Sequence, residues 1–195
     1  MKFTNPPGAT PIDLDSGDDL IPPLTTQEQL NQFEQTNITL ALEWATKSRK
    51  LKSTLLTVNG LVDLHRKMFD QTWGWAGKFR RKDLNIGAAW AQVPEQTKSV
   101  CDDVSYWDVN NIFSRVEIAV RFHHRLVLVH PFLNGNGRHS RLAADLFLHY
   151  RKQKRLSWGG RISLAESSPD RNEYILALRE ADRGEYERLI RFASK

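Results

Sequence analysis

The strongest constraint on the fold is a pair of helical segments separated by a turn through which no helix can run. Apolar residues recur at helical spacing from about 115 to 129 and again after Gly137 as far as Tyr150. Between them the chain reads HPFLNGNGR, in which Pro131 lacks an amide and two glycines admit left-handed backbone angles. The sequence therefore predicts two packed helices joined by a tightly curled backbone.

Helical periodicity and helix-end signals continue along most of the chain. We expect one helix from about Thr25, with Asn37 as a candidate break, and a second whose buried face carries Leu61, Leu64 and Met68. Three more are expected over about 94 to 107, 171 to 182 and 185 to 193, and Gly184 separates the last two. Residues 84 to 93 are expected to form a short hairpin. The predicted fold class is mainly α, a helical bundle with one small β-hairpin.

Composition bounds the organisation and the location of the protein. The chain has 195 residues with 40% hydrophobic content, which suits one independent core. Prolines and glycines crowd residues 1 to 24, so we expect an extended arm there and a single domain over residues 25 to 195. Because Cys101 stands alone and no apolar leader or membrane span is present, a cytoplasmic protein without membrane association is expected.

The charge balance favours anionic ligands without selecting nucleic acid. The formal net charge is +5 and the pI is near 9.4. Basic residues occur in short groups, 78 to 82 and 151 to 155, separated by acidic residues. This pattern is typical of solvated faces rather than of one continuous nucleic-acid stripe. Nucleic acid is therefore not an expected partner.

The turn between the two helices has the chemistry of an anion site. Gly135 and Gly137 let consecutive amides point into one concavity, and a helix beginning near Asn136 adds its positive dipole end. Arg138 and Arg141 are three residues apart, so they share one helical face and can grip the outer phosphates of a nucleotide. These residues predict a nucleotide cradle.

His130 lies across the turn from this cradle and is the candidate general base. An imidazole with an ordinary pKa near 6.5 can accept a proton close to neutrality. Because the turn holds no serine or cysteine nucleophile, the attacking hydroxyl is expected to belong to a second substrate. A Gly-Asn-Gly turn or a histidine at a helix end is common when taken singly, so the combination carries the prediction.

Other chemistries find less support in the residues. His123, His124 and His139 invite a metal-site interpretation, but no further cluster of ligands stands at zinc-like spacing, so we expect them to pack in the core or on the surface. The tryptophans are expected to fill the core instead of stacking on bases. Trp90 is the exception, since a position on the hairpin would let it contact a partner.

The stretch from His130 to Arg141 resembles the signature of the Fic family, H-x-F-x-[D/E]-G-N-G-R-x-x-R. The matching residues are His130, Phe132, Gly135, Asn136, Gly137, Arg138 and Arg141. Asn134 departs from the signature, because the family usually has Asp or Glu there. Residues 64 to 66, 75 to 80 and 174 to 184 also resemble the family. The arm over residues 1 to 24 and the segment over residues 30 to 38 are similar to its branch called mobile mystery protein B.

This resemblance implies a Fic fold and transfer of AMP from ATP to a Ser, Thr or Tyr hydroxyl of a target protein. His130 would be the base and Phe132 would anchor the turn. The resemblance assigns phosphate contacts to Gly135, Asn136, Gly137, Arg138 and Arg141. Fic kinases of the Doc type carry a lysine at the place of Gly137, so AMP transfer is the implied reaction.

The resemblance also implies a flap, a metal and a brake. The hairpin, as the flap, would align the target by strand addition through Ile86, Gly87, Trp90 and Val93. Asn134 takes the place of the carboxylate that helps to hold Mg²⁺, and a neutral amide oxygen is a weaker ligand for a hard cation. This departure leaves three outcomes open: the activity is reduced, it is shifted to another nucleotide, or it is lost.

The brake of the family is a helix with the pattern [S/T]-x-x-x-E-[G/N]. Thr39 and Glu43 match it within a candidate inhibitory helix around residues 37 to 47, although Trp44 departs from it. The resemblance implies that Glu43 pairs with Arg141 and blocks the γ-phosphate, or that it supports removal of AMP.

Two alternatives stay open beside the transferase. Asn134 is compatible with a catalytically weak Fic domain that binds nucleotide or a partner as a regulator. The basic charge is compatible with a nucleic-acid-binding accessory protein of a mobile element. The target protein and the preferred nucleotide cannot be read from the residues, and a homo-oligomer is left open.

Overall fold

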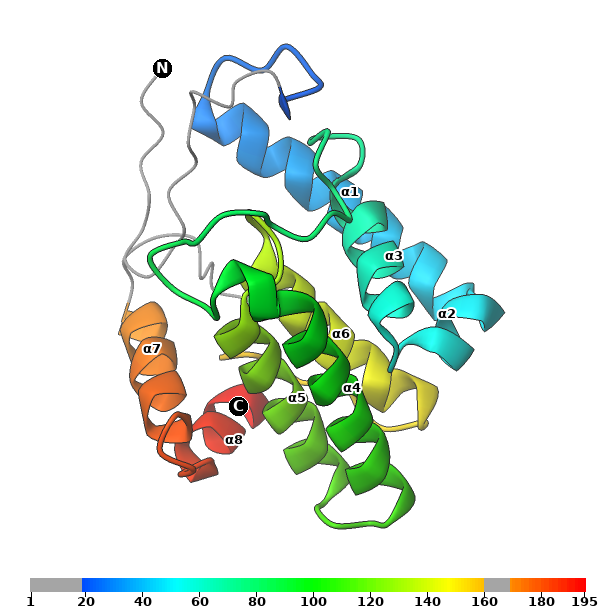
Figure 1. The fold of residues 1–195 in the computed structure, drawn as a ribbon, viewed down its shortest axis with the longest axis vertical. Helices are drawn as coiled ribbons and strands as arrows, with labels where there is room; N and C mark the ends of the chain where they lie inside the picture. Colours follow the sequence, from blue (N-terminus) through cyan, green and yellow to red (C-terminus); the bar gives the residue numbers. More distant parts are fainter. Residues whose placement is uncertain (1–18, 160–168) are drawn as a thin grey trace.

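The computed structural model describes residues 19–159 and 169–195. The helices are α1 (Gln27–Lys47), α2 (Arg49–Thr54), α3 (Val58–Phe69), α4 (Val93–Val109), α5 (Arg115–Val129), α6 (Asn136–Tyr150), α7 (Pro169–Ala181) and α8 (Glu187–Ser194), and the 3₁₀ turn η2 (Trp90–Gln92) precedes α4. Two central helices, α5 and α6, pack against each other, and α1 with α3, α4, and α7 with α8 lie around them (Figure 1). Helices dominate, as predicted.

The core is built around α5 and α6. Every residue of α6 from 142 to 148 is buried, so this helix is surrounded by protein on nearly all sides. The rings of Phe122 on α5 and Phe147 on α6 meet edge to face, with centroids 6.5 Å apart. Since α5 and α6 are the helices on either side of the HPFLNGNGR turn, this packing brings the two ends of the turn together.

The first long helix begins as predicted but is not broken. Thr26 caps α1 by accepting a hydrogen bond from the Gln29 amide, and the Gln29 side chain completes a capping box. The expected break near Asn37 was wrong, because α1 runs on to Lys47. Asn37 is instead buried, and its amide donates to the hydroxyl of Thr72 at 3.1 Å. A polar contact with the next layer therefore satisfies the side chain inside the helix.

The end of the predicted arm is attached to the loop after α3. Leu20 and Trp73 form an isolated antiparallel bridge. The Ile21 amide donates to the Thr72 carbonyl at 2.9 Å, and the Gly74 amide donates to the Asp19 carbonyl at 2.8 Å. The rest of the arm, residues 1–18, lies outside the described residues.

The predicted β-hairpin over residues 84 to 93 is not formed. Within the described ranges the structure contains no strand, and this segment is a loop that ends in η2. Its backbone pairs with the end of α5 rather than with itself, since the Ala88 amide donates to the Val129 carbonyl at 3.3 Å. The carboxylate of Asp83 accepts from the Trp90 amide at 2.7 Å and draws the two ends of the loop together. These bonds take the place of a hairpin ladder.

The remaining helix signals were read correctly. Pro94 lies in the first turn of α4, where its missing amide costs nothing. Gly184, between α7 and α8, has a φ of 89°, a left-handed angle that suits a residue without a side chain. The short α2 was not anticipated. Among the described residues, no helix is long and apolar enough to span a membrane.

Several histidines are core residues, and packing in the core was one of the two positions expected for His123 and His139. His65, His123 and His139 are fully buried. His139 has Nε2 3.0 Å from the Leu61 carbonyl, and His123 has Nε2 2.9 Å from the Tyr174 hydroxyl. Burial lowers the pKa of His139 to about 4 and holds the pKa values of His65 and His123 well below the ordinary 6.5. They are neutral parts of the core near pH 7.

These neutral histidines predict that the protein loses stability in mild acid. Below the ordinary pKa of 6.5 the unfolded chain takes up protons that the folded protein refuses until about pH 4. The stabilisation is complete above pH 6.5 and is lost as the pH falls through this window. His139 should lower the free energy of unfolding by about 1.4 kcal/mol between about pH 7.5 and pH 5.5, and the lowered pKa values of His65 and His123 act in the same direction. Urea unfolding at the two pH values measures the difference.

A matched pair of variants tests the origin of this pH dependence. His139→Gln should reduce the slope of stability against pH, whereas His149→Gln, at an exposed position of the same helix, should leave it unchanged. Stability that does not change between the two pH values would contradict the assignment of neutral buried histidines.

Candidate active site

His130 ends α5 in a left-handed backbone conformation, with φ 52° and ψ 61°. This conformation costs a residue with a side chain roughly 1–3 kcal/mol, so the surroundings must hold it. The His130 amide donates to the Leu126 carbonyl at 3.0 Å, and Nδ1 lies 3.3 Å from the Val127 carbonyl. The ring is 7% exposed. The predicted base is thus built into the helix end and does not lie on a mobile surface loop.

The side chain of Asn136 closes the turn. Its Oδ1 accepts from the Phe132 amide at 2.9 Å, and its Nδ2 donates to the Phe132 carbonyl at 2.8 Å. Phe132 is fully buried and stacks on His65, with ring centroids 3.6 Å apart. The anchoring position expected for Phe132 is confirmed. Asn136 was expected to contact phosphate, but both polar atoms of its amide are engaged in the turn, which leaves its backbone for a ligand.

The start of α6 offers an anion site. Its N-cap is Gly135, and no side chain caps the first turn, so backbone amides and the positive dipole end remain available. A Cβ on Gly135 would lie 2.6 Å from the Phe69 ring, and its φ is 77°, so glycine is required there. Among the described residues, a Cβ on Gly137 would meet only Nη1 of Arg141, at 3.6 Å. Within that part of the chain, Gly137 therefore has free space on the side that faces this cation.

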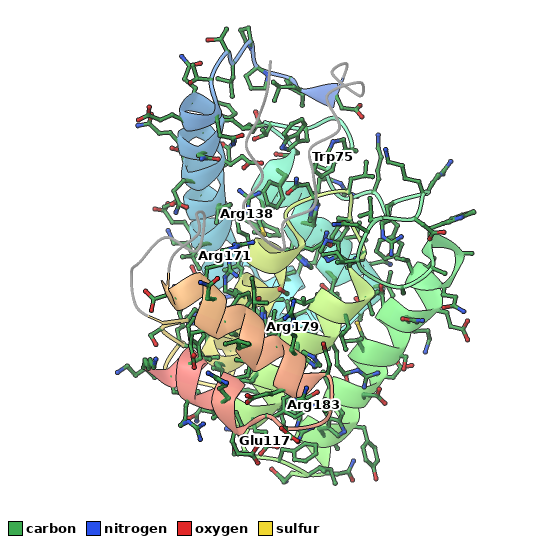
Figure 2. All side chains as sticks on the ribbon, turned by 90° about the vertical axis from the view of Figure 1, so that its left-hand side faces the viewer. Trp75, Glu117, Arg138, Arg171, Arg179 and Arg183 are labelled. Carbon is green, nitrogen blue, oxygen red and sulfur yellow. The ribbon has the colours of Figure 1, made fainter. Side chains whose placement is uncertain are left out.

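The two arginines of the turn reach opposite walls of the site. Arg138 donates from Nη1 to Glu34 on α1 at 2.5 Å, and Figure 2 shows Arg138 beside that helix. Arg141 has its guanidinium 5.8 Å from the ring centroid of Tyr174 on α7. The sequence predicted that both would grip one polyphosphate. The structure brings Arg141 to Gly137 and holds Arg138 against α1.

Glu34 was missed by the sequence analysis. It is 4% exposed, and its second oxygen accepts from the Trp73 indole nitrogen at 2.8 Å. A detectable signal existed, because Glu34 belongs to the buried stripe of α1, where a carboxylate needs a partner. The other buried members of this stripe are Leu30, Asn37, Ala41 and Ala45.

Glu43, which the sequence suggested as the brake, lies on α1 but away from Glu34. Glu43 is exposed, and among the described residues its carboxylate forms no ion pair with Arg138 or Arg141. Thr39 is also exposed and donates its hydroxyl to the Gln35 carbonyl of its own helix at 2.9 Å. Glu43 stands nine residues beyond Glu34, roughly 13 Å along the helix axis. The spacing pattern had selected the wrong glutamate for contact with a motif arginine.

Asn134 is bound into the turn. Its Oδ1 accepts from the Gly135 amide at 2.5 Å, and its carbonyl lies 3.1 Å from Nε2 of His65. The Gly77 amide donates to Nδ1 of the same ring at 3.0 Å, so the Nε2 proton points to Asn134. Among the described residues, no group of three or more His, Cys, Asp or Glu could hold a metal ion. Asn134 does not fit a metal site held by the protein.

The loop expected to act as the flap rests on His130. Gly87 has a φ of 101°, and a Cβ there would lie 2.6 Å from the Cβ of His130. Ile86 is 37% exposed and Trp90 is 46% exposed, so both can meet a partner. Val93 is fully buried as the first residue of α4 and is removed from the predicted docking surface.

Burial lowers the pKa of His130 to about 4, and the nearby charge of Arg80 acts in the same direction. The Val127 carbonyl opposes this shift by stabilising the protonated ring. The imidazole is therefore neutral at pH 7 and able to accept a proton. The site combines a neutral base, an uncapped helix start and an arginine. This combination suits group transfer at phosphorus.

Comparisons with known proteins agree with this geometry. The Fic/DOC family model matches residues 55–148. A protein named adenylyltransferase Fic from Nematostella vectensis is 24% identical over 159 residues, which cover 80% of this chain and 35% of that relative. The chain thus spans about a third of the length of this curated relative.

Solved structures share the fold. A Fic-domain signalling protein from Bacteroides thetaiotaomicron superposes with a TM-score of 0.69 at 19% identity, over 87% of this chain and 70% of the other. BepC from Bartonella tribocorum, solved with bound AMPPNP, has a TM-score of 0.62 at 16% identity, over 87% and 86% of the two chains. The helical bundle around the HPFLNGNGR turn is therefore a Fic fold, and residues 55–148 within it match the model of the Fic/DOC family.

Proposed function

We propose that this protein transfers AMP from ATP to a Ser, Thr or Tyr hydroxyl of a target protein. The observation that carries the proposal is the start of α6 at Gly137, which no side chain caps and which is open among the described residues. Arg141 borders it, and one closed turn joins it to the neutral imidazole of His130. The helix start provides the charge complement for phosphates, and His130 provides the base.

The reaction follows from these positions. The phosphate chain of ATP lies on the amides at the start of α6, with Arg141 beside it. His130 accepts the proton of the target hydroxyl as its oxygen attacks the α-phosphorus. The bond from that phosphorus to the bridging oxygen breaks, pyrophosphate leaves, and AMP stays on the target. The helix dipole and Arg141 stabilise the charge that develops on the phosphate oxygens.

The comparisons supply support at the level of the family. Curated relatives carry the name protein adenylyltransferase, and BepC was solved with AMPPNP, an analogue of ATP. Gly137, where the sequence comparison with Doc-type kinases places a lysine, leaves space beside Arg141. Since this chain spans only a part of the length of those relatives, the activity, the substrate and the target are part of the proposal.

We further propose that Glu34 restrains the enzyme. Arg138 is the arginine expected to hold the outer phosphates, and Glu34 already occupies its guanidinium from a buried position on α1. A phosphate must displace this carboxylate, and displacement would leave Glu34 with only the Trp73 indole as a partner. Nucleotide binding in a productive geometry therefore competes with an internal salt bridge.

A second candidate function rests on Asn134. Because its amide oxygen already accepts from the Gly135 amide, the protein contributes little to holding a cation, and the phosphates of ATP would carry its coordination. A domain that binds nucleotide as a regulator and transfers AMP slowly is the alternative.

Replacing Glu34 should release transfer. Glu34→Gly should raise incorporation from α-labelled ATP into a cell lysate or into the protein itself at least about tenfold, because Arg138 becomes available to phosphate. Glu43→Gly is the matched control, since it puts the same helix-weakening glycine at an exposed site of α1. Adding His130→Ala should abolish the label. A larger increase from Glu43→Gly than from Glu34→Gly would reject this brake, and label that survives loss of His130 would reject the base.

The two glycines of the turn should respond differently to a methyl group. Gly137→Ala should fold normally, because its Cβ meets only Arg141, but its methyl group should intrude on a bound phosphate and weaken ATP binding at least about tenfold, near 1.4 kcal/mol. Gly135→Ala should lower the melting temperature, because its Cβ overlaps the Phe69 ring. Calorimetric titration with ATP and thermal unfolding check both. Unchanged ATP affinity in Gly137→Ala would remove the nucleotide from the start of α6.

Restoring a carboxylate separates the transferase from the regulator. Asn134→Asp should increase the transfer rate and lower the Mg²⁺ concentration that gives half of the maximal rate, since a charged oxygen is a better ligand for this cation. The measurement is a Mg²⁺ titration of label incorporation in the Glu34→Gly background. An identical titration for the two proteins would show that Asn134 has no bearing on the metal requirement.

A further inference from the structure

A buried arginine lies directly beneath the base. Arg80 is 2% exposed and is among the largest fully buried side chains of the described residues. A charge in such a position needs strong compensation, because water is excluded from it. Asp83 offers little, since its carboxylate is 3.8 Å away and 66% exposed. The compensation must come from other groups.

Backbone carbonyls surround the guanidinium. Nε of Arg80 donates to the His130 carbonyl at 2.7 Å. The other two nitrogens donate to the carbonyls of Lys82 at 3.0 Å, Ala88, and Val129 at 3.4 Å. Val129 and His130 are the last residues of α5, where unpaired carbonyls form the negative end of the helix dipole. The buried cation is thus held by a helix end and by the loop that follows Arg80.

The same arginine holds both peptide groups that follow the base. The His130 carbonyl accepts from Nε, and the Pro131 carbonyl accepts from the backbone amide of Arg80 at 3.0 Å. Proline has no amide with which to secure the chain in another way. These two bonds oppose relaxation of His130 from its left-handed conformation, which its own side chain disfavours.

The loop over residues 82 to 90 is tied to the base through the same group. Two of its carbonyls, Lys82 and Ala88, accept from Arg80, one near each end. Between them Gly87 lies against the Cβ of His130, as close as a residue without a side chain can come. A displacement of the guanidinium would therefore move both the imidazole and the loop beside it.

We propose that Arg80 is a positioning residue. It holds the imidazole of His130 and the 82–90 loop in fixed positions relative to each other. The expected effect of Arg80 on the transfer rate rests on the transfer function proposed above. Its expected effect on the 82–90 loop does not. The side-chain hydrogen bonds of Arg80 reach the end of α5 and the 82–90 loop, and none of them reaches the start of α6. A lysine cannot take its place, because an ammonium group has its three donors on one atom and cannot reach carbonyls on two sides as the planar fork does.

The test variants are Arg80→Lys and Arg80→Ala. The controls are the same two changes at the exposed neighbour, Arg81→Lys and Arg81→Ala. All four are made in the Glu34→Gly background. Three quantities are measured: amide exchange of residues 82–90, the dissociation constant of ATP, and the maximal rate of label incorporation from ATP. For Arg80→Lys we expect amide exchange at least tenfold faster in the loop, a rate at least a hundredfold lower, and ATP affinity within twofold. The Arg81 variants should match the parent in all three.

Chemical rescue separates positioning from general damage to the fold. Guanidinium chloride at millimolar concentration should restore part of the rate and of the loop protection in Arg80→Ala, while ammonium chloride should not. If Arg80→Ala does not fold, Arg80→Lys with the same two salts takes its place. Rates and ATP affinity that fall in parallel, or rescue by neither salt, would overturn the proposal.

The two proposals can fail separately. Absence of label from the Glu34→Gly parent itself would reject the transfer function and leave the loop exchange as a test of Arg80. Exchange of residues 82–90 in Arg80→Lys equal to that of the parent would reject the role of Arg80, whatever the parent transfers.

Discussion

The structure of the site depends on the reversal of the chain between α5 and α6. The Asn136 side chain closes the turn, because its Oδ1 accepts from the Phe132 amide and its Nδ2 donates to the Phe132 carbonyl. The stacked ring of His65 fixes Phe132 in the core. With the turn closed, the end of α5, which carries the base, and the start of α6, which attracts anions, are held in one rigid unit. A loop of the same composition without these bonds would let the two halves of the chemistry drift apart.

The groups around this turn come from helices distant in the sequence. On one wall, α1 supplies Glu34 to Arg138, and on the other, α7 supplies Tyr174 to Arg141. The two cations of one helical turn are therefore controlled by different parts of the bundle. A change in the packing of α1 acts on the outer phosphates, whereas the base depends on Arg80 and the carboxyl end of α5. Restraint of the nucleotide and placement of the base are thus separable in physical terms.

Much of the architecture could be predicted because it depends on local patterns. The limits of α5 followed from apolar periodicity, and the break at Gly184 followed from the left-handed angle that ends a helix. The hairpin was wrong because the backbone of residues 84 to 93 finds its partners on α5, which strand propensity does not register. The brake was assigned to Glu43 from a spacing pattern, yet the carboxylate that meets a motif arginine is the one on the buried stripe of α1.

The sequence by itself determined which segments are helical, where the chain must turn and which chemical groups the turn carries, because each depends on residues a few positions apart. Tertiary structure decided which carboxylate meets Arg138, a residue 104 positions away in the chain. It also decided that Arg80 is buried beneath His130, which is 50 positions away. The physical reason is that a buried charge takes whatever partner the packed helices bring to it. That partner is set by the docking of α1 on α6 and of the 82–90 loop on α5, which no local pattern encodes.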